Sequence, residues 1–259
     1  MGEPEPLLVT NGLAIGYPGQ VLVRDIGITL RKGELTSLIG VNGIGKSTLL
    51  RTLGGLQPAQ AGRVIICGKE TRTLSAMARA RLIAMVLTGR PTTGTLDVGT
   101  VVAMGRQPWT DRWGREQEQD HRIIQRALER AGAEDLVQRT LSTCSDGEFQ
   151  KVLIARALAQ DTPVILLDEP TAFLDLPNRV GIIRTLRAIA LAEGKAVFFS
   201  THDLQLAMDL CDRIVLLRKE APLWQGTPAE ALASAELSNA FAGTGIRLDP
   251  TTGTHRFDR

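Results

Sequence analysis

The sequence predicts an α/β protein built on a mostly parallel sheet, and two features lead to this fold class. From position 163 onward, apolar runs alternate with segments whose apolar residues have helical spacing; the runs are 164–167, 196–199 and 213–217, and the helical segments are 180–192 and 204–210. Earlier, a glycine-rich loop at 40–45 follows the apolar run 35–39 and precedes a helical segment at 47–53. This alternation is typical of parallel strands that are covered by helices.

Apart from the helical segment at 47–53, residues 7 to about 70 predict a β-rich region. Turns rich in Gly, Pro and charged residues separate the candidate strands 13–17, 26–30 and 64–68. Short apolar runs bounded by such turns are the usual sequence pattern of a β-rich region.

The middle of the chain, from about 72 to 160, predicts mainly helix with a break at 89–99 that is rich in Gly, Thr and Pro. Within it, apolar residues recur at helical spacing over 120–131. The basic residues from Arg106 through Arg130 are expected on a solvated helical surface, with docking to a partner chain as the less favoured interpretation. Residues 228–259 are weakly patterned and predict little.

Composition excludes several classes of protein. The chain has 259 residues, a net charge of +2 and 4% aromatic residues, so it lacks the basic surface and stacking residues of a nucleic-acid-binding protein. Its three cysteines, Cys67, Cys144 and Cys211, are far apart and odd in number, which suits a reducing cytoplasm and argues against a disulfide framework or a zinc site. No apolar run approaches the length of a membrane span.

The glycine-rich loop carries the first chemical motif. Residues 40–48 read GVNGIGKST and fit the P-loop pattern G-x-x-x-x-G-K-[ST]. We expect backbone N–H groups of this loop to surround phosphate; the loop residues are Gly40, Asn42, Gly43 and Gly45. Lys46 is expected to reach the β- and γ-phosphates, Ser47 to bind Mg²⁺ and Thr48 to contact the α-phosphate. The alternative, a glycine turn that fits by chance, is disfavoured because strand, loop and helix come in the required order.

Two adjacent carboxylates, Asp168 and Glu169, follow the apolar run 164–167. A strand that presents acids at its carboxyl end is how a nucleotide-binding sheet supplies a Mg²⁺ partner and a base that orients water. The alternative, a pair that caps a helix, is disfavoured by the strand before it and the Pro-Thr after it. Upstream, a polar turn at 145–148 opens a helix-like segment at 152–159, and an ordinary P-loop enzyme has no use for this turn.

These motifs, in this order from Tyr17 to His202, resemble the ATP-binding subunits of ABC transporters. The resemblance implies a P-loop ABC ATPase fold with a RecA-like α/β core, an N-terminal antiparallel β subdomain and an inserted helical subdomain at about 85–160. It implies a single nucleotide-binding domain over 7–243, followed by a C-terminal tail at 244–259. The implied activity is ATP hydrolysis coupled to transport, with ATP and Mg²⁺ bound.

The resemblance also implies a role for individual residues. Tyr17 would stack on adenine, although a lone aromatic residue at a strand end is more often a core residue. Catalysis would use Glu169 as the base, with Lys46 and His202 on the γ-phosphate; a capping or solvated His202 is the alternative. The remaining contacts come from the signature turn, with Ser145, Gly147 and Glu148, and from Asp175 in the loop that bridges two subunits. The nearby Leu141-Ser142 resembles a signature start, but the helix that follows places the register on Ser145.

The sequence departs from the family pattern at two places. In the signature turn, Cys144 replaces the usual Leu, Asp146 replaces Gly, and Glu148 stands where Gln is common. The second departure concerns the glutamine that normally helps to bind Mg²⁺ and couples the site to the membrane partner. Counting back from Gly105-Arg106 places that position at Thr88, and no glutamine occurs from 61 to 106. Thr88 is therefore the candidate metal ligand there.

The segment 104–109, with the aromatic and basic residues that follow through Arg115, is similar to the importers of iron–siderophore complexes, haem and cobalamin. The implied partners are a second copy of the chain packed head to tail, two transmembrane permease subunits and a substrate-binding protein, with no nucleic acid. The implied location is peripheral, on the cytoplasmic face of the inner membrane. The alternatives are the ATPase of another importer or exporter, or a soluble non-transport ABC ATPase, which would need a coiled-coil insertion or a second P-loop.

Overall fold

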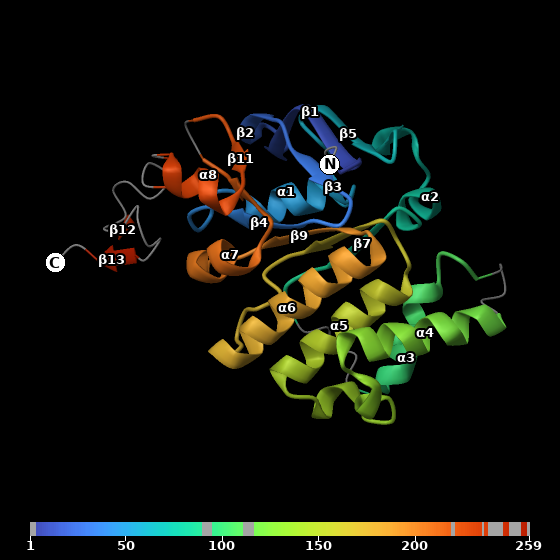
Figure 1. Cartoon of the computed structure of the whole chain (residues 1–259). Coiled ribbons are helices and arrows are strands. Elements are labelled where there is room, and N and C mark those ends of the chain that lie inside the picture. Colours follow the sequence, from blue (N-terminus) through green and yellow to red (C-terminus); the bar gives the residue numbers. More distant parts are fainter. Residues whose placement is uncertain are drawn as a thin grey trace.

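The structure is a computed structural model that describes residues 4–89, 95–110, 117–218, 221–234, 236–237, 246–248 and 255–257. It contains a large, mostly parallel sheet and an antiparallel sheet, with helices on both sides of the large sheet (Figure 1). A short pair, β12 (Ile246–Leu248) and β13 (His255–Phe257), forms a separate antiparallel ladder. The α/β fold class predicted from the sequence is confirmed.

The large sheet has six strands in the order β11-β10-β4-β9-β8-β7. Their bounds are β11 Trp224–Gly226, β10 Arg213–Leu216, β4 Leu35–Ile39, β9 Ala196–Ser200, β8 Val164–Leu167 and β7 Ile83–Val86. All neighbours pair in parallel except β10 and β11. Because these strands run in parallel, their carboxyl ends lie at one edge, where the sheet can present several side chains to one ligand.

The antiparallel sheet contains β2 (Gln20–Ile26), β1 (Pro6–Tyr17), β5 (Ala61–Ile66) and β6 (Lys69–Glu70), and β3 (Thr29–Arg31) also pairs with β1. The single strand predicted at 26–30 is wrong, because the chain leaves the ladder between β2 and β3. The hydroxyl of buried Thr10 bonds to the backbone between these two strands. It donates to the Ile26 carbonyl and accepts from the Ile28 N–H, each at 2.8 Å. One side chain thus supplies hydrogen bonds that a continuous strand would make with its neighbour.

The helices follow most of the predicted positions. They are α1 Lys46–Leu53, α2 Ala76–Ala80, α3 Val98–Ala103, α4 Glu118–Ala131, α5 Asp146–Ala159, α6 Leu176–Glu193, α7 Leu204–Leu210 and α8 Pro228–Ala233. Short 3-10 turns lie at Thr71–Thr73, Met104–Arg106, Glu134–Leu136 and Leu141–Thr143. None of the helices in the described segments is long and apolar enough to cross a membrane.

The middle of the chain is mainly helical, as expected, but it departs from the expectation at two places. The region includes the strand β7, a four-residue apolar run that is too short for periodicity to separate it from buried helix. Arg106 is not on a solvated surface: it is 3% exposed, and its Nε atom lies 2.8 Å from Asp120 Oδ1. Arg122, from the same basic stretch, is well exposed.

Successive residues of the central strands face two different apolar clusters. Leu166 and Phe198 pack with α1 and the antiparallel sheet, whereas Leu167 and Phe199 pack with α3–α6. Figure 1 shows this layering, with α3, α4, α5 and α6 on one side of the parallel sheet and α1 on the other. Burial on both faces explains why these strands are apolar at every position.

Candidate functional site: a phosphate-binding cavity at the sheet edge

A cavity of about 620 Å³ opens at the carboxyl ends of the parallel strands. Its lining comes from the end of β1, the start of β2, the loop before α1, the first residues of α1 and the residues that follow β8 and β9. These residues are Tyr17, Gln20, Leu22, Asn42, Gly43, Gly45, Lys46, Ser47, Thr48, Glu169 and His202. Residues far apart in sequence therefore meet around the glycine-rich loop.

Glycine is required at two positions of this loop. Gly45, which precedes α1, has φ of +111°, in the region that disfavours side chains. A Cβ atom at Gly40 would lie 2.8 Å from the Leu217 carbonyl oxygen, closer than real contacts allow. The loop can thus turn tightly from β4 into α1, and the N–H groups at the start of α1 remain available for an anion.

Lys46 lies over this loop with only 6% of its surface exposed. Its Nζ atom donates to the carbonyl oxygens of Gly40, at 2.8 Å, and Val41, at 3.3 Å. Burial lowers the pKa of the Lys46 ammonium, while the carboxylates of Glu169 and Asp168 act in the opposite direction. The cation is held beside the loop by neutral carbonyl groups, which phosphate oxygens can replace.

Asp168 is buried at the end of β8 and joins three segments of the site. Its Oδ1 atom accepts hydrogen bonds from Ser47 Oγ at 3.1 Å and from Ser200 Oγ at 2.8 Å. Ser200 Oγ also accepts from the backbone N–H of Glu169 at 2.8 Å. Sequence reasoning assigned no role to Ser200; its place at the carboxyl end of an apolar strand was the available signal.

Glu169 and His202 form a pair at the mouth of the cavity. Glu169 Oε1 lies 2.5 Å from His202 Nε2, and both side chains remain partly exposed. Glu169 has φ of +50°, which is uncommon for a residue with a side chain and is found where a site requires it. The strand ends of β8 and β9 thus bring a carboxylate and an imidazole to the position where the sequence predicts them.

Tyr17, at the end of β1, is not a core residue. It is 48% exposed, and its hydroxyl lies 3.4 Å from Thr48 Oγ1. A tyrosine ring that is open to the cavity mouth offers a flat surface on which a base can stack.

The signature turn has a clear structural role at the start of α5. Ser145 caps the helix by accepting from the Glu148 N–H, and the Glu148 carboxylate accepts from the Ser145 N–H at 2.8 Å. The hydrogen bonds from Ser145 lower the pKa of Glu148, and Arg139, at 2.7 Å, adds to this effect. This reciprocal pair is a capping box, which explains an acid at this position.

Ser145, Gly147 and Glu148 are not among the described residues that line the cavity at the sheet edge. Asp175 is not among them either; its side chain caps α6 by accepting from the Asn178 N–H at 3.1 Å. A Cβ atom at Gly147 would lie 3.5 Å from the Asn178 side chain, so the signature turn and the start of α6 are neighbours. Within one chain, the signature turn and the start of α6 therefore lie together, outside the lining of the cavity that contains the P-loop.

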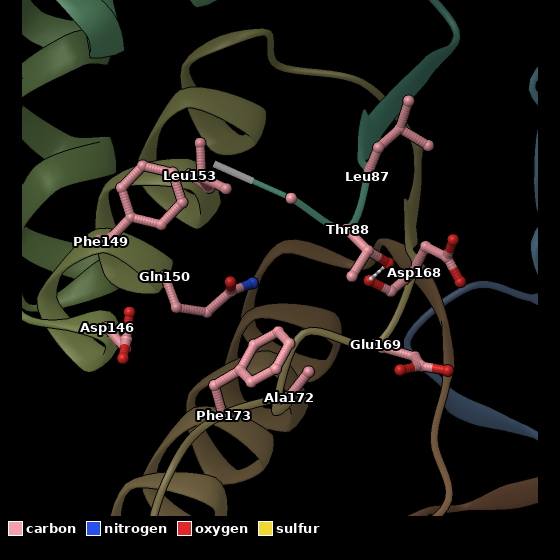
Figure 2. Close-up of a pocket in the computed structure, with 11 residues that line it drawn as sticks. Leu87, Thr88, Asp146, Phe149, Gln150, Leu153, Asp168, Glu169, Ala172 and Phe173 are labelled. Carbon is pink, nitrogen blue, oxygen red and sulfur yellow. Dashed lines mark hydrogen bonds between the residues drawn. The ribbon is translucent and has the colours of Figure 1, made fainter. Parts of the chain in front are cut away.

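Thr88 follows β7 and lies beside Asp168. Its hydroxyl donates to the Asp168 backbone carbonyl oxygen at 2.9 Å (Figure 2). Thr88 also lines a small pocket of about 60 Å³ that reaches Asp168 and Glu169 on one side and Gln150 of α5 on the other. Sequence reasoning did not single out Gln150. The sequence also singled out the segment that starts at position 104 and continues through Arg115; residues 111–115 of this segment lie outside the described part of the chain.

Comparison with known proteins agrees with this geometry. The model of the ABC transporter family matches residues 23–172. The chain is 37% identical to an ABC transporter ATP-binding protein of Methanocaldococcus jannaschii, over 87% of this chain and 78% of that protein. It is 38% identical to the cobalamin import ATP-binding protein BtuD of Halobacterium salinarum, over 95% of this chain but only 62% of that protein. The iron(3+)-hydroxamate import ATP-binding protein FhuC of Bacillus subtilis is 35% identical, over 95% of this chain and 91% of that protein.

Solved structures show the same fold. The cbiO1 subunit of an ABC transporter complex from Clostridium perfringens superimposes with a TM-score of 0.79 at 26% identity, over 92% of this chain and 94% of that one. A dimeric bacterial ABC transporter cassette gives a TM-score of 0.73 at 25% identity, over 85% and 98%. The chain belongs to the ABC transporter family, as one of its ATP-binding, ATP-hydrolysing subunits.

Proposed function

We propose that this chain hydrolyses ATP to power an importer of iron–siderophore complexes, haem or cobalamin. One observation carries the catalytic part: Lys46, Ser47, Glu169 and His202 line a single cavity at the sheet edge, and the buried Asp168 carboxylate bonds to Ser47. The substrate class is supported by relatives that are named for import of cobalamin, iron(3+)-hydroxamate and ferric enterobactin.

In this proposal, ATP lies along the cavity with adenine on Tyr17 and its phosphates in the loop 40–48. The exposed Tyr17 ring and the buried Lys46 ammonium support this orientation, because one suits a base and the other an anion. Lys46 then exchanges its bonds to loop carbonyls for bonds to the β- and γ-phosphates.

The residues present also fit Mg²⁺. The Ser47 hydroxyl and the Asp168 carboxylate lie 3.1 Å apart, and hard oxygen donors of this kind are the ligands that Mg²⁺ prefers. Thr88 is proposed as a weaker contact through water, since its hydroxyl proton is used by the Asp168 carbonyl while its oxygen can still accept. When bound, the ion would neutralise charge on the transferred phosphate.

Glu169 is proposed as the base that orients the attacking water. Its contact with His202 fixes the carboxylate at the cavity mouth, and His202 lies where it can then stabilise charge on the γ-phosphate. The constrained backbone of Glu169 supports this role, because it sets the direction of the side chain before the nucleotide arrives.

We further propose that two copies pack head to tail, so that Ser145 and Gly147 of one copy contact the γ-phosphate held by the other. Glu148 would keep the turn in shape, and Asp175 would lie at the junction. The exposure of Ser145, its absence from the described lining of its own cavity and the dimeric structural relative support this arrangement. The proposed domain extends over 7–243, with a helical subdomain at about 85–160 and a tail at 244–259.

The remaining partners are proposed to be two permease subunits and a substrate-binding protein, with the chain at the cytoplasmic face of the inner membrane. The test is reconstitution of the chain with its two permease chains and binding protein in vesicles, followed by ATP-dependent uptake of each metal chelate. Uptake of one class is the expected result. Efflux, or another imported solute, would indicate another transporter class, and ATPase activity without permease binding would indicate a non-transport ABC ATPase.

A further inference from the structure

The small pocket behind the catalytic carboxylates connects two parts of the molecule. One wall consists of Thr88, Asp168 and Glu169, and the opposite wall belongs to α5, with Gln150 extending from it toward Thr88 (Figure 2). Glu169 lines this pocket as well as the phosphate-binding cavity. The proposed base therefore borders both the pocket and the phosphate-binding cavity.

Gln150 presents an unusual group to this pocket. Its Nε2 atom is buried and has no hydrogen-bond partner among the described residues. Its neighbours on α5, Phe149 and Leu153, are largely buried apolar side chains that also line the pocket. A buried amide without a partner destabilises the folded chain, so such a group is expected to have a ligand in the working protein.

Thr88 is complementary to this amide. Because its hydroxyl donates to the Asp168 carbonyl oxygen, the Thr88 oxygen can act toward the pocket only as an acceptor. An amide N–H is only a donor. A volume of about 60 Å³ is enough for water molecules, and a bound water needs two to four polar partners. Gln150, Thr88 and the Glu169 carboxylate can supply them.

The position of Gln150 on α5 adds a mechanical consequence. The helix begins at Asp146, directly after Ser145, so Gln150 is little more than one turn from the signature turn. A contact between Ser145 and a nucleotide on a partner copy would move the rigid helix that carries Gln150.

We propose that Gln150 is a positioning residue for hydrolysis: together with Thr88 it holds water against Glu169 and links the signature turn to the proposed base. Gln150 thereby provides, from α5, an amide near the carboxylates that the segment 61–106 does not contain. This inference rests on the proposed role of Glu169.

The test compares Gln150→Leu, Thr88→Val and the double variant in the full-length chain. Gln150→Leu should lower the maximal ATPase rate about tenfold, the size expected when one hydrogen bond around a charged group is lost. ATP affinity should not change. The melting temperature of the nucleotide-free chain should stay the same or rise, because the variant removes a buried donor that has no partner. The double variant should be no slower than the slower single variant, since both act on one water network.

Gln160→Leu, at the residue that caps the carboxyl end of the same helix, is the matched control. The Gln160 amide has two structural partners, the carbonyl oxygens of Ala80 and Ile83 at 2.6 and 2.9 Å. Its replacement should lower the melting temperature and leave the rate per folded chain unchanged. Adding Thr88→Gln to the Gln150→Leu chain should restore part of the rate, because an amide then enters the pocket from the other wall.

The proposal is overturned if Gln150→Leu keeps the wild-type rate, if it lowers the melting temperature as Gln160→Leu does, or if the two single losses multiply in the double variant. Glu169→Gln separates this failure from failure of the proposed function. If that variant is inactive while Gln150→Leu is fully active, only the role of Gln150 is wrong; if Glu169→Gln is fully active, the proposed base is wrong.

Discussion

Glu169 is the residue at which backbone geometry and proposed chemistry coincide. Its left-handed backbone, its N–H bond to Ser200 and its contact with His202 together fix the carboxylate at the cavity mouth. A conformation of this kind costs about 1–3 kcal/mol, so it persists only where neighbouring contacts determine it.

Glu169→Gln should keep ATP binding and lower turnover about 10²–10⁴-fold, because an amide has the same shape but cannot act as a base. The measurements are a nucleotide titration and a steady-state ATPase rate. Glu118→Gln, at a well-exposed carboxylate on α4, is the control and should behave as wild type. Loss of ATP binding in Glu169→Gln would instead indicate a role in holding the nucleotide.

Lys46→Ala should show the reverse behaviour, with ATP affinity reduced about 10- to 100-fold, since a charge-assisted bond to phosphate is removed. The comparison is Lys69→Ala, an exposed lysine on β6, whose ATP affinity should not change. Equal ATP affinity in the Lys46→Ala and wild-type chains would contradict the assigned phosphate contact.

The lowered pKa of Lys46 adds a dependence on pH in the nucleotide-free chain. The folded chain releases this proton below the ordinary value of 10.5, at which the unfolded chain releases it. Between the two values the unfolded state binds more protons, so the contribution of Lys46 to stability rises with pH. In the Lys46→Ala chain this increase of the unfolding free energy with pH should be lost, as measured by urea unfolding at several alkaline pH values.

The site was predictable where a local motif encodes it. The P-loop, Asp168, Glu169 and His202 lie directly after apolar strands, and strand order along the sequence is enough to bring them to one edge. Ser200 and Gln150 were missed because their importance depends on tertiary neighbours: Ser200 bonds Asp168 across 32 positions, and Gln150 faces a loop some 60 residues away.

At the scale of elements, the same reasoning explains which strands and helices were predictable. The amphipathic helix α4 has clear periodicity, and the apolar strands β8 and β9 are bounded by turns. The strand β7 offers only four residues, and its identity depends on parallel pairing with β8, which no local pattern encodes. The division between β2 and β3 depends likewise on one distant threonine, Thr10.

The helix α5 connects the signature turn to the core, and Ser145→Arg tests its exposed start. The variant should bind ATP but fail to form an ATP-stabilised dimer in the Glu169→Gln background, as measured by size-exclusion chromatography with ATP. Loss of the cap itself should cost only about 1 kcal/mol. Thr227→Arg, which removes the same type of capping box from α8, is the control and should still dimerise. A stable ATP-bound dimer of the Ser145→Arg chain would contradict the head-to-tail arrangement.

The buried pair of Arg106 and Asp120 joins α4 to the end of α5, because Arg106 also donates to the Ala159 carbonyl at 2.9 Å. Arg106→Met should lower the free energy of unfolding by about 3–5 kcal/mol, since it leaves a buried carboxylate without its cation. Urea unfolding measures this change. Adding Asp120→Leu to Arg106→Met should recover much of the lost unfolding free energy. Arg122→Met, which breaks an exposed pair, is the control and should lower the unfolding free energy by less than about 1 kcal/mol. Equal effects of the two arginine variants would refute the structural role of Arg106.

At the scale of the whole molecule, the nucleotide cavity lies where the two sheets meet. Tyr17 and Gln20 come from the antiparallel sheet, whereas Glu169 and His202 come from the parallel one. A nucleotide in this cavity would therefore contact both layers of one chain, and the signature turn, which lies outside the described lining, remains available to a second chain.

This separation leads to a test of the assembly with two inactive chains. Lys46→Ala has a defective P-loop but an intact signature turn, and Ser145→Arg has the opposite defect. In a head-to-tail dimer of one chain of each kind, the intact P-loop faces the intact signature, so one of the two composite sites is complete. Equal mixing should restore about one quarter of the wild-type ATPase rate, because about half of the dimers are mixed and each has one working site. Mixing Lys46→Ala with Glu169→Gln is the control: both defects then lie on the P-loop side of each composite site, so no site is complete. No recovery in the first mixture would mean that a single chain supplies all the residues of its own site. Recovery in the control would instead mean that Lys46 and Glu169 of one site come from different chains.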